Sequence, residues 1–131
     1  MKNLLTVALF CLILSASNLF AQSNLTWTIK DQLGKGVIKT TTVFNSNFSG
    51  FLNKQEAIAF CQKLKTNPEV ASCEIVTNSG ANCDMKLTMK QPHNKQYYVS
   101  LAQKLNITNI AVNGQKKTTA EMMQEIRNKN K

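Results

Sequence analysis

Catalytic residue types are scarce in this chain, which has one histidine, one arginine and no Cys-x-x-Cys pair. A Ser-His-Asp triad would have to use His93 with Asp31 or Asp84, and neither aspartate stands in a motif that positions a base. The cysteine spacing excludes a thiol-redox motif of the Cys-x-x-Cys type. The only Gly-x-Gly, at residues 34–36, has the features of a turn and not of a phosphate loop. We therefore expect a protein that is not an enzyme and that has no cofactor and no metal site.

Residues 1–21 have the layout of a cleavable secretory signal peptide. Lys2 precedes an apolar run over residues 4–14, and a stretch with small residues then ends at Ala21. The run is much shorter than the roughly 20 apolar residues of a transmembrane helix. Lipidation at Cys11 is disfavoured because a phenylalanine, and not a small residue, precedes that cysteine. We expect cleavage after Ala21, or alternatively after residue 16 or 17. The product would be a secreted or periplasmic protein of a bacterial cell envelope that does not span the membrane.

Lysine supplies nearly all of the positive charge. The chain has 16 lysine and arginine residues against 7 acidic residues, a net charge of +9, and its only arginine is Arg127. Arginine is the preferred residue for bidentate phosphate contacts, and the lysines are spread along the whole chain, so we do not expect nucleic acid as a partner. A solvated lysine surface is one interpretation. The other is a surface that binds an anionic lipid or glycan, or a protein partner, of the envelope.

Residues 22–131 have the length of a single domain and contain both strand and helix patterns. Period-two alternation or β-branched residues predict strands at residues 25–30, 37–44, 70–76, 83–90 and 107–112. Residues 31–36 and 45–50 are predicted as connections, and residues 77–80 as the turn of a hairpin. Apolar residues at helical spacing predict helices at 53–67 and 94–105. A third helix is predicted in the tail after a capping box from Thr118 to Glu121, and the basic end of this tail is expected to fray.

The two central helix segments repeat one another. The sequences NKQEAIAFCQKL at 53–64 and NKQYYVSLAQKL at 94–105 share Asn-Lys-Gln and Gln-Lys-Leu, and a predicted strand precedes and follows each. A duplicated β-α-β unit predicts an α+β ferredoxin-like split sandwich, with two helices on one face of an antiparallel sheet. The strand at 25–30 would be an addition at the amino end. Chance convergence of two amphipathic helices is one alternative. A β-β-α repeat, in which strand 25–30 forms a tight hairpin with strand 37–44, is another.

Three cysteines remain if residues 1–21 are removed, and all three fall on the apolar sides of their predicted elements. In an oxidising compartment three cysteines usually form one disulfide and leave one thiol. A hairpin that turns about Asn78 would place Cys73 opposite Cys83, whereas a bridge from the helix to the following strand would join Cys61 to Cys73. Both pairings stay open. As an alternative to a disulfide, the three thiols would form a site that carries a metal or a small ligand.

A contact surface is predicted where the second helix begins. Tyr97 and Tyr98 are adjacent, so helical spacing turns at least one ring outward, beside Lys95 and His93. The leading hypothesis is an exported, non-enzymatic binding or accessory protein that docks on an envelope protein or on an anionic envelope component. The alternative is a carrier of a small ligand, a metal or a thiol that uses the three cysteines.

Overall fold

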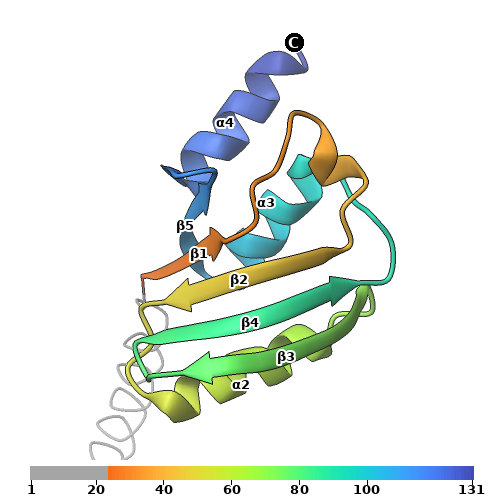
Figure 1. The fold of residues 1–131 in the computed structure, drawn as a ribbon. Coiled ribbons are helices and arrows are strands. Elements are labelled where there is room, and N and C mark those ends of the chain that lie inside the picture. Colours follow the sequence, from red (N-terminus) through yellow and green to blue (C-terminus); the bar gives the residue numbers. More distant parts are fainter. Residues whose placement is uncertain (1–23) are drawn as a thin grey trace, which may run out of the picture.

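The computed structural model describes residues 24–131, so the predicted signal peptide lies outside the described residues. The chain forms a two-layer domain, with a six-stranded mixed sheet and helices on one face of it (Figure 1). The α+β prediction is confirmed. None of the helices within residues 24–131 has the length and hydropathy of a membrane-spanning segment. The elements, in chain order, are β1 (Leu25–Ile29), the 3-10 helix η1 (Val37–Lys39), β2 (Val43–Ser49), α2 (Lys54–Lys65), β3 (Val70–Asn78), β4 (Asn82–Met89), α3 (Lys95–Lys104), β5 (Ile107–Val112), β6 (Gln115–Thr118) and α4 (Thr119–Lys129).

The strands lie in the order β3-β4-β2-β1-β5-β6. Neighbouring strands are antiparallel except for β1 and β5, which run parallel. Each of α2, α3 and α4 follows an antiparallel pair of strands, which are β1-β2, β3-β4 and β5-β6 in turn. The element order is therefore β-β-α three times. The first pair, however, joins residues 25–29 to residues 43–49, and not to residues 37–44 by a tight turn.

A ferredoxin-like arrangement is not confirmed. The segments β2-α2-β3 and β4-α3-β5 follow the expected chain order, but β1 lies between β2 and β5. The first strand is thus a central strand and not an addition to the sheet. Its inward residues explain this position, because Leu25, Trp27 and Ile29 are all buried and the Trp27 indole N–H donates to the Ser46 hydroxyl of β2 at 2.9 Å. A sixth strand, β6, which the sequence analysis did not predict, forms one edge of the sheet.

The second strand was predicted at residues 37–44, and this position is wrong. Residues 37–39 form a 3-10 helix that begins after Gly36, whose φ of 79° is left-handed, and the strand itself covers residues 43–49. This strand contains serine and asparagine, which are weak strand formers. Phe44, Ser46 and Phe48 nevertheless alternate inward, and β2 pairs with β4 over its whole length and with β1 over residues 46–49. Pairing on both sides therefore overrides the local propensity.

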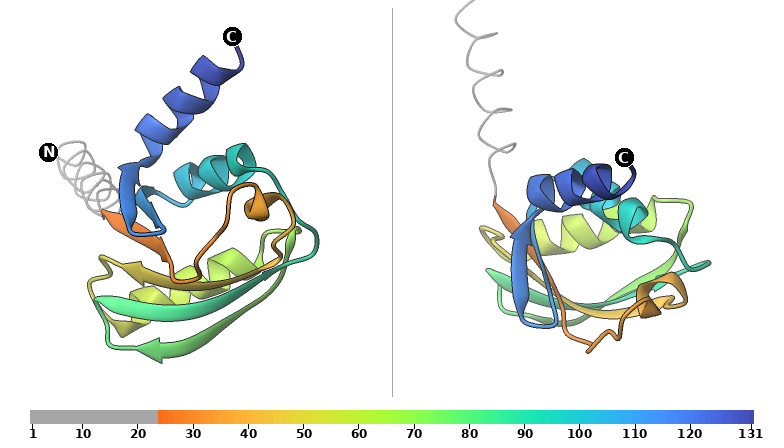
Figure 2. Two further views of the ribbon diagram at one scale, coloured as in Figure 1. Left: turned by 45° about the horizontal axis from the view of Figure 1, so that its top comes forward. Right: turned by 90° about the horizontal axis from the view of Figure 1, so that it is seen from above.

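The predicted helices are confirmed, and the structure shows a side-chain cap at the start of each. The side chains of Asn53 and Asn94 each accept a hydrogen bond at 2.9 Å from the backbone amide three residues ahead. Thr118 and Glu121 form the predicted capping box at the start of α4. Helix α4 continues to Lys129, so part of the tail that was expected to fray is helical. The left view of Figure 2 shows α4 pointing away from the sheet. Thr119 and Met122 of its first turn are buried, and Met123 and Ile126 also pack against the core.

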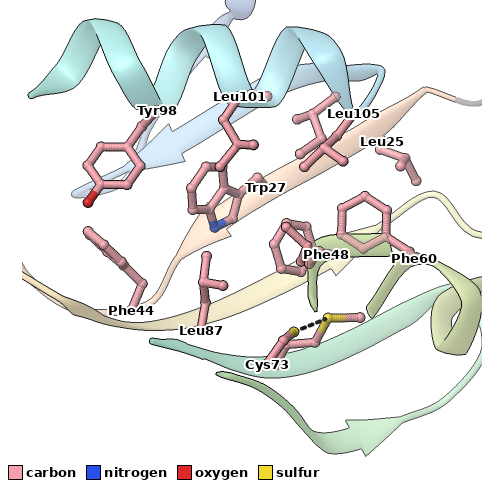
Figure 3. Packing of buried hydrophobic residues seen from close by; sticks show 14 of the residues in the cluster. Leu25, Trp27, Phe44, Phe48, Phe60, Cys73, Leu87, Tyr98, Leu101 and Leu105 are labelled. Carbon is pink, nitrogen blue, oxygen red and sulfur yellow. Dashed lines mark hydrogen bonds between the residues drawn. The ribbon is translucent and has the colours of Figure 1, made fainter. Parts of the chain in front are cut away.

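The core lies between the sheet and the helices and is rich in aromatic rings (Figure 3). The Trp27 ring stacks on Phe48 with centroids 5.7 Å apart and meets Phe44 and Tyr98 edge-on at 6.4 Å. Phe60 of α2 reaches Phe48 at 4.9 Å. This aromatic cluster links β1, β2, α2 and α3, so the two helices are held to one shared centre.

Candidate functional site

A cavity of about 410 Å³ lies where α3, α4 and the segment between β1 and β2 meet the sheet. Its floor consists of apolar residues from the two parallel strands, Trp27 and Ile29 of β1 and Ile110 and Val112 of β5. Helix α3 contributes Tyr98 and Val99, and the first turns of α4 contribute Met122. Residues 33–38 close another side, and Figure 1 shows this orange segment beside α3. Lysines from three different segments also line it, and we call it the lysine-rimmed cavity.

The segment between β1 and β2 is held in place by two asparagine contacts. Asn113 and Gly114 have φ values of 53° and 78°, so they form a two-residue turn between β5 and β6 of the type that favours Asn-Gly. The Asn113 side chain accepts from the Leu33 backbone N–H at 2.8 Å and donates to the Leu33 carbonyl at 2.7 Å. Two residues before Leu33, the Asp31 carboxylate accepts from the backbone and the side-chain amide of Asn45 of β2 at 2.9 and 3.0 Å. This side of the cavity is therefore a fixed wall.

The rim of the cavity is positively charged. Lys35, Lys95 and Lys117 line it, each from a different segment. The Lys117 ammonium forms a 2.8 Å ion pair with Glu125 of α4. This hydrogen bond, together with the charges of Lys117, Lys95 and Lys129, lowers the pKa of Glu125. One carboxylate thus faces several cations, and the rim keeps a net positive charge.

Tyr98 carries a buried hydroxyl without a partner. Its side chain is 3% exposed, and its Oη is the one buried side-chain polar atom of residues 24–131 that makes no hydrogen bond of acceptable geometry. Burial raises the pKa of Tyr98, and the nearby backbone N–H of His93 acts in the opposite direction. Such an amide approaches the oxygen as a donor, so the hydroxyl proton still lacks an acceptor. The Tyr98 side chain lines the cavity, but its Oη has almost no accessible surface, so a bound molecule reaches the hydroxyl only when the side chains that cover it shift.

The predicted contact surface divides into two parts. The His93 ring stacks on Tyr97 with centroids 3.8 Å apart, and its Nε2 lies 3.1 Å from a Glu69 carboxylate oxygen. Lys95 and Tyr98 lie instead on the wall of the lysine-rimmed cavity. Tyr97 is half-buried and Tyr98 is buried, so the four residues do not form one exposed surface. Two of the four therefore belong to the candidate site.

The three cysteines are all buried, and two of them are in contact. The sulfur atoms of Cys61 in α2 and Cys73 in β3 lie 3.2 Å apart (Figure 3). Burial and the hydrogen bond between the two thiols raise the pKa of Cys73, and burial likewise raises the pKa of Cys83. Within residues 24–131 no group of three His, Cys, Asp or Glu side chains is placed to hold a metal ion.

The hairpin geometry that would place Cys73 opposite Cys83 is wrong. Cys73 pairs with Leu87, and Cys83 pairs with Asn78, because the turn lies at residues 79–81 and not about Asn78. Gly80, with a φ of 95°, supplies the left-handed residue of this turn. Two irregularities of the β3-β4 register add to the offset. Of the two cysteine pairs considered from the sequence, the structure brings together Cys61 and Cys73.

The fold and the site define a two-layer α+β domain with one lysine-rimmed cavity between its layers. No family model matches the chain, and neither a search of curated proteins nor a search of solved structures finds a match. Function is therefore argued from the site itself.

Most of this site is not predictable from the sequence. The sequence predicts Lys95 and Tyr98 as part of a contact surface, and residues 31–36 only as a connection. Asn113-Gly114 was the available signal, because this dipeptide after a strand indicates a two-residue hairpin. The contact between Asn113 and Leu33 joins residues 80 positions apart, and no local sequence pattern predicts it.

Proposed function

We propose that this protein is a non-enzymatic binding protein and that the lysine-rimmed cavity is its binding site. One observation carries the proposal, namely a cavity of about 410 Å³ with an apolar floor and a positively charged rim. Sites for small ligands typically have volumes of about 300–1,000 Å³, with apolar walls and a few polar groups. The lining offers lysines and a tyrosine hydroxyl, which suit binding, and it does not pair a nucleophile with a base among the described residues.

We further propose that the protein works outside the cytoplasm, in the periplasm or after secretion. The support is the signal-peptide layout of residues 1–21. An accessory role beside an envelope protein or an anionic envelope component fits the excess of lysine. The single arginine disfavours nucleic acid as the partner.

The binding proposal is tested with N-phenyl-1-naphthylamine, a neutral apolar dye whose fluorescence rises in apolar surroundings. We expect saturable binding to the purified protein. The substitution Val112→Phe fills part of the floor and should abolish binding, whereas Val76→Phe on the exposed edge strand β3 should leave it unchanged. Thermal unfolding of both variants establishes that they fold. Absence of dye binding, or equal binding by the two folded variants, would contradict the proposal.

We also propose that Cys61 and Cys73 form a disulfide in the exported protein, which would tie α2 to β3 and leave Cys83 as a buried thiol. The 3.2 Å approach of the two sulfur atoms supports this pairing. In the reaction the two thiols lose two protons and two electrons to a disulfide-bearing oxidant, whose own disulfide becomes a dithiol.

Alkylation of the unfolded, unreduced protein tests the pairing. We expect one thiol to be modified, and mass mapping should find it at Cys83. Protein that lacks residues 1–21 and is made in a reducing cytoplasm is the control, with three modified thiols. A bridge between Cys73 and Cys83 would contradict the pairing. Three free thiols with stoichiometric metal in exported protein would favour the carrier alternative.

A further inference from the structure

We infer that the ligand of the lysine-rimmed cavity is a small amphipathic monoanion, a carboxylate attached to an apolar chain, which enters as a free molecule. This inference rests on the proposed function, because it names the chemistry of the molecule that would occupy the same site. Three features of the cavity carry it: the apolar floor, the charge left over on the rim and the hydroxyl of Tyr98.

The apolar floor of the cavity favours a ligand with an apolar part. Trp27, Ile29 and Ile110 are each at most 6% exposed, so they form the base of the cavity and have little open surface of their own. Val112, Ile38 and Leu33 are half-buried and offer more apolar surface to a ligand. Apolar surface at these residues is covered by a ligand with a gain proportional to the area removed from water. A sugar or a bare inorganic anion would bring no such area and would leave the floor without a partner.

The lysines of the rim favour a ligand with one negative charge. Lys117 is already paired with Glu125, whereas the structure gives Lys35 and Lys95 no ion pair among residues 24–131. A single anionic group is attracted to these two cations. A dianion would gain from the same lysines, but its second charge would act against the nearby Glu125 carboxylate.

The Tyr98 hydroxyl favours a ligand that carries a hydrogen-bond acceptor. Its hydroxyl proton has no partner, and Lys95 stands three residues earlier on α3, which places the two side chains on neighbouring positions of one helix face. A carboxylate has two oxygens, so it can accept from the Lys95 ammonium and, once the side chains that cover Oη shift, from the Tyr98 hydroxyl as well. The lack of a nearby arginine fork argues for this simple anion over a phosphate group.

The cavity suits a free molecule better than a lipid in a bilayer. It lies between the sheet and the helices, and the hydrogen bonds from Asn113 to Leu33 hold its outer wall in place. A ligand is therefore taken in between the layers, where both its apolar chain and its charged group find partners.

Displacement of N-phenyl-1-naphthylamine by ten-carbon compounds tests the ligand class. We expect decanoate to bind at least tenfold more tightly than decanol, and decyltrimethylammonium to bind most weakly. From hexanoate to decanoate, each methylene should tighten binding about fourfold until the cavity is filled. Equal binding of decanoate and decanol would overturn the ligand class and leave the proposed function standing, whereas a failure of the dye itself to bind would remove the proposed function.

Two lysines of α3 provide a matched pair of variants. Lys95→Met removes the charge at the cavity, and Lys104→Met removes a charge from the exposed end of the same helix. We expect Lys95→Met to weaken decanoate binding at least fivefold, without an effect on decanol, and Lys104→Met to leave both unchanged. Equal losses in the two variants would mean unspecific attraction by the lysine surface and would overturn the inference.

Two further compounds separate the competing anions. Decyl phosphate, a dianion at pH 8, should bind more weakly than decanoate, and tighter binding would overturn the choice of a monoanion. The protein should not sediment with vesicles of phosphatidylglycerol. Co-sedimentation together with no effect of decanoate on dye binding would assign the site to a lipid surface instead.

Discussion

Helix α2 and helix α3 cover the two halves of the sheet in different ways. Helix α2 buries Ala57, Phe60, Cys61 and Leu64, and its cysteine touches β3. Helix α3 also buries four residues, but with α4 and residues 33–38 it encloses the lysine-rimmed cavity. The comparison suggests a division of roles, in which the α2 half stabilises the domain and the α3 half gives up packing density to hold a ligand.

The largest expected effect is that of a large-to-small substitution in the α2 half, compared with one in the α3 half. Leu64→Ala in α2 removes a side chain that is 1% exposed, and we expect a loss of about 4 kcal/mol in the free energy of unfolding. Met122→Ala in α4 should cost less, about 2 kcal/mol, because Met122 already borders empty space. Urea unfolding of the two variants measures both values. A greater loss in Met122→Ala would contradict the proposed division.

Reduction of the proposed disulfide is the next effect in size. Opening a bridge that closes a loop of this length should lower the free energy of unfolding by about 3 kcal/mol. The same loss should occur in Cys83→Ala, whereas Cys61→Ala, which cannot form the bridge, should not respond to reductant. Denaturant unfolding with and without reductant gives the comparison. An equal response of the Cys61→Ala variant would show that the effect has another origin.

The wall of the cavity is tested at Asn113. Asn113→Gly keeps a residue that adopts a positive φ but loses both hydrogen bonds to Leu33, so we expect a loss of about 1–2 kcal/mol. Asn106→Gly is the matched control, because Asn106 also has a positive φ, of 59°, and lies outside the cavity lining. Hydrogen exchange at the Leu33 amide should speed up only in Asn113→Gly. Unchanged exchange there would mean that the wall is held by other contacts.

The same contrast explains what the sequence could predict. Helices α2 and α3 follow from apolar spacing and from Asn53 and Asn94, because caps and periodicity are local signals. Strand β2 does not follow, since its serines and asparagines become a strand only between β1 and β4. Strand β6 is short and polar and carries no alternation, although the Asn-Gly turn before it is a signal.

The candidate site was harder to predict than the fold because long-range contacts assemble it. The sequence predicts Lys95 and Tyr98 as part of a contact surface, because both stand near the start of α3. Their shared cavity depends on residues 33–38, which reach it through the contact between Leu33 and Asn113. The sequence left two cysteine pairings open, Cys61 with Cys73 and Cys73 with Cys83. The β3-β4 register, which depends on the turn at Gly80, keeps Cys83 away from Cys73, whereas Cys61 and Cys73 are in contact.

The smallest expected effect concerns the Tyr98 hydroxyl in the absence of a ligand. Tyr98→Phe removes a buried donor that has no acceptor, so we expect the free energy of unfolding to rise by about 1 kcal/mol at neutral pH. Tyr97→Phe, at a half-buried ring stacked on His93, is the control and should change stability by less than about 0.5 kcal/mol. A stabilised Tyr98→Phe variant that binds decanoate poorly would show that the hydroxyl serves the ligand and not the fold.

Alkaline pH should enlarge the difference in the free energy of unfolding between wild type and Tyr98→Phe. Burial raises the pKa of Tyr98 in the folded protein above its ordinary value of 10.0, so above that pH the unfolded chain releases a proton that the folded chain keeps. Ionisation of Tyr98 therefore leaves the wild-type stability unchanged below pH 10 and lowers it as the pH rises above 10. The informative quantity is the gap in stability between wild type and Tyr98→Phe, because the two proteins differ only in this hydroxyl. A gap that stays constant from pH 8 to pH 11 would mean that the hydroxyl ionises as freely in the folded protein as in the unfolded chain. Tyr98 would then not be the enclosed donor on which the choice of ligand rests.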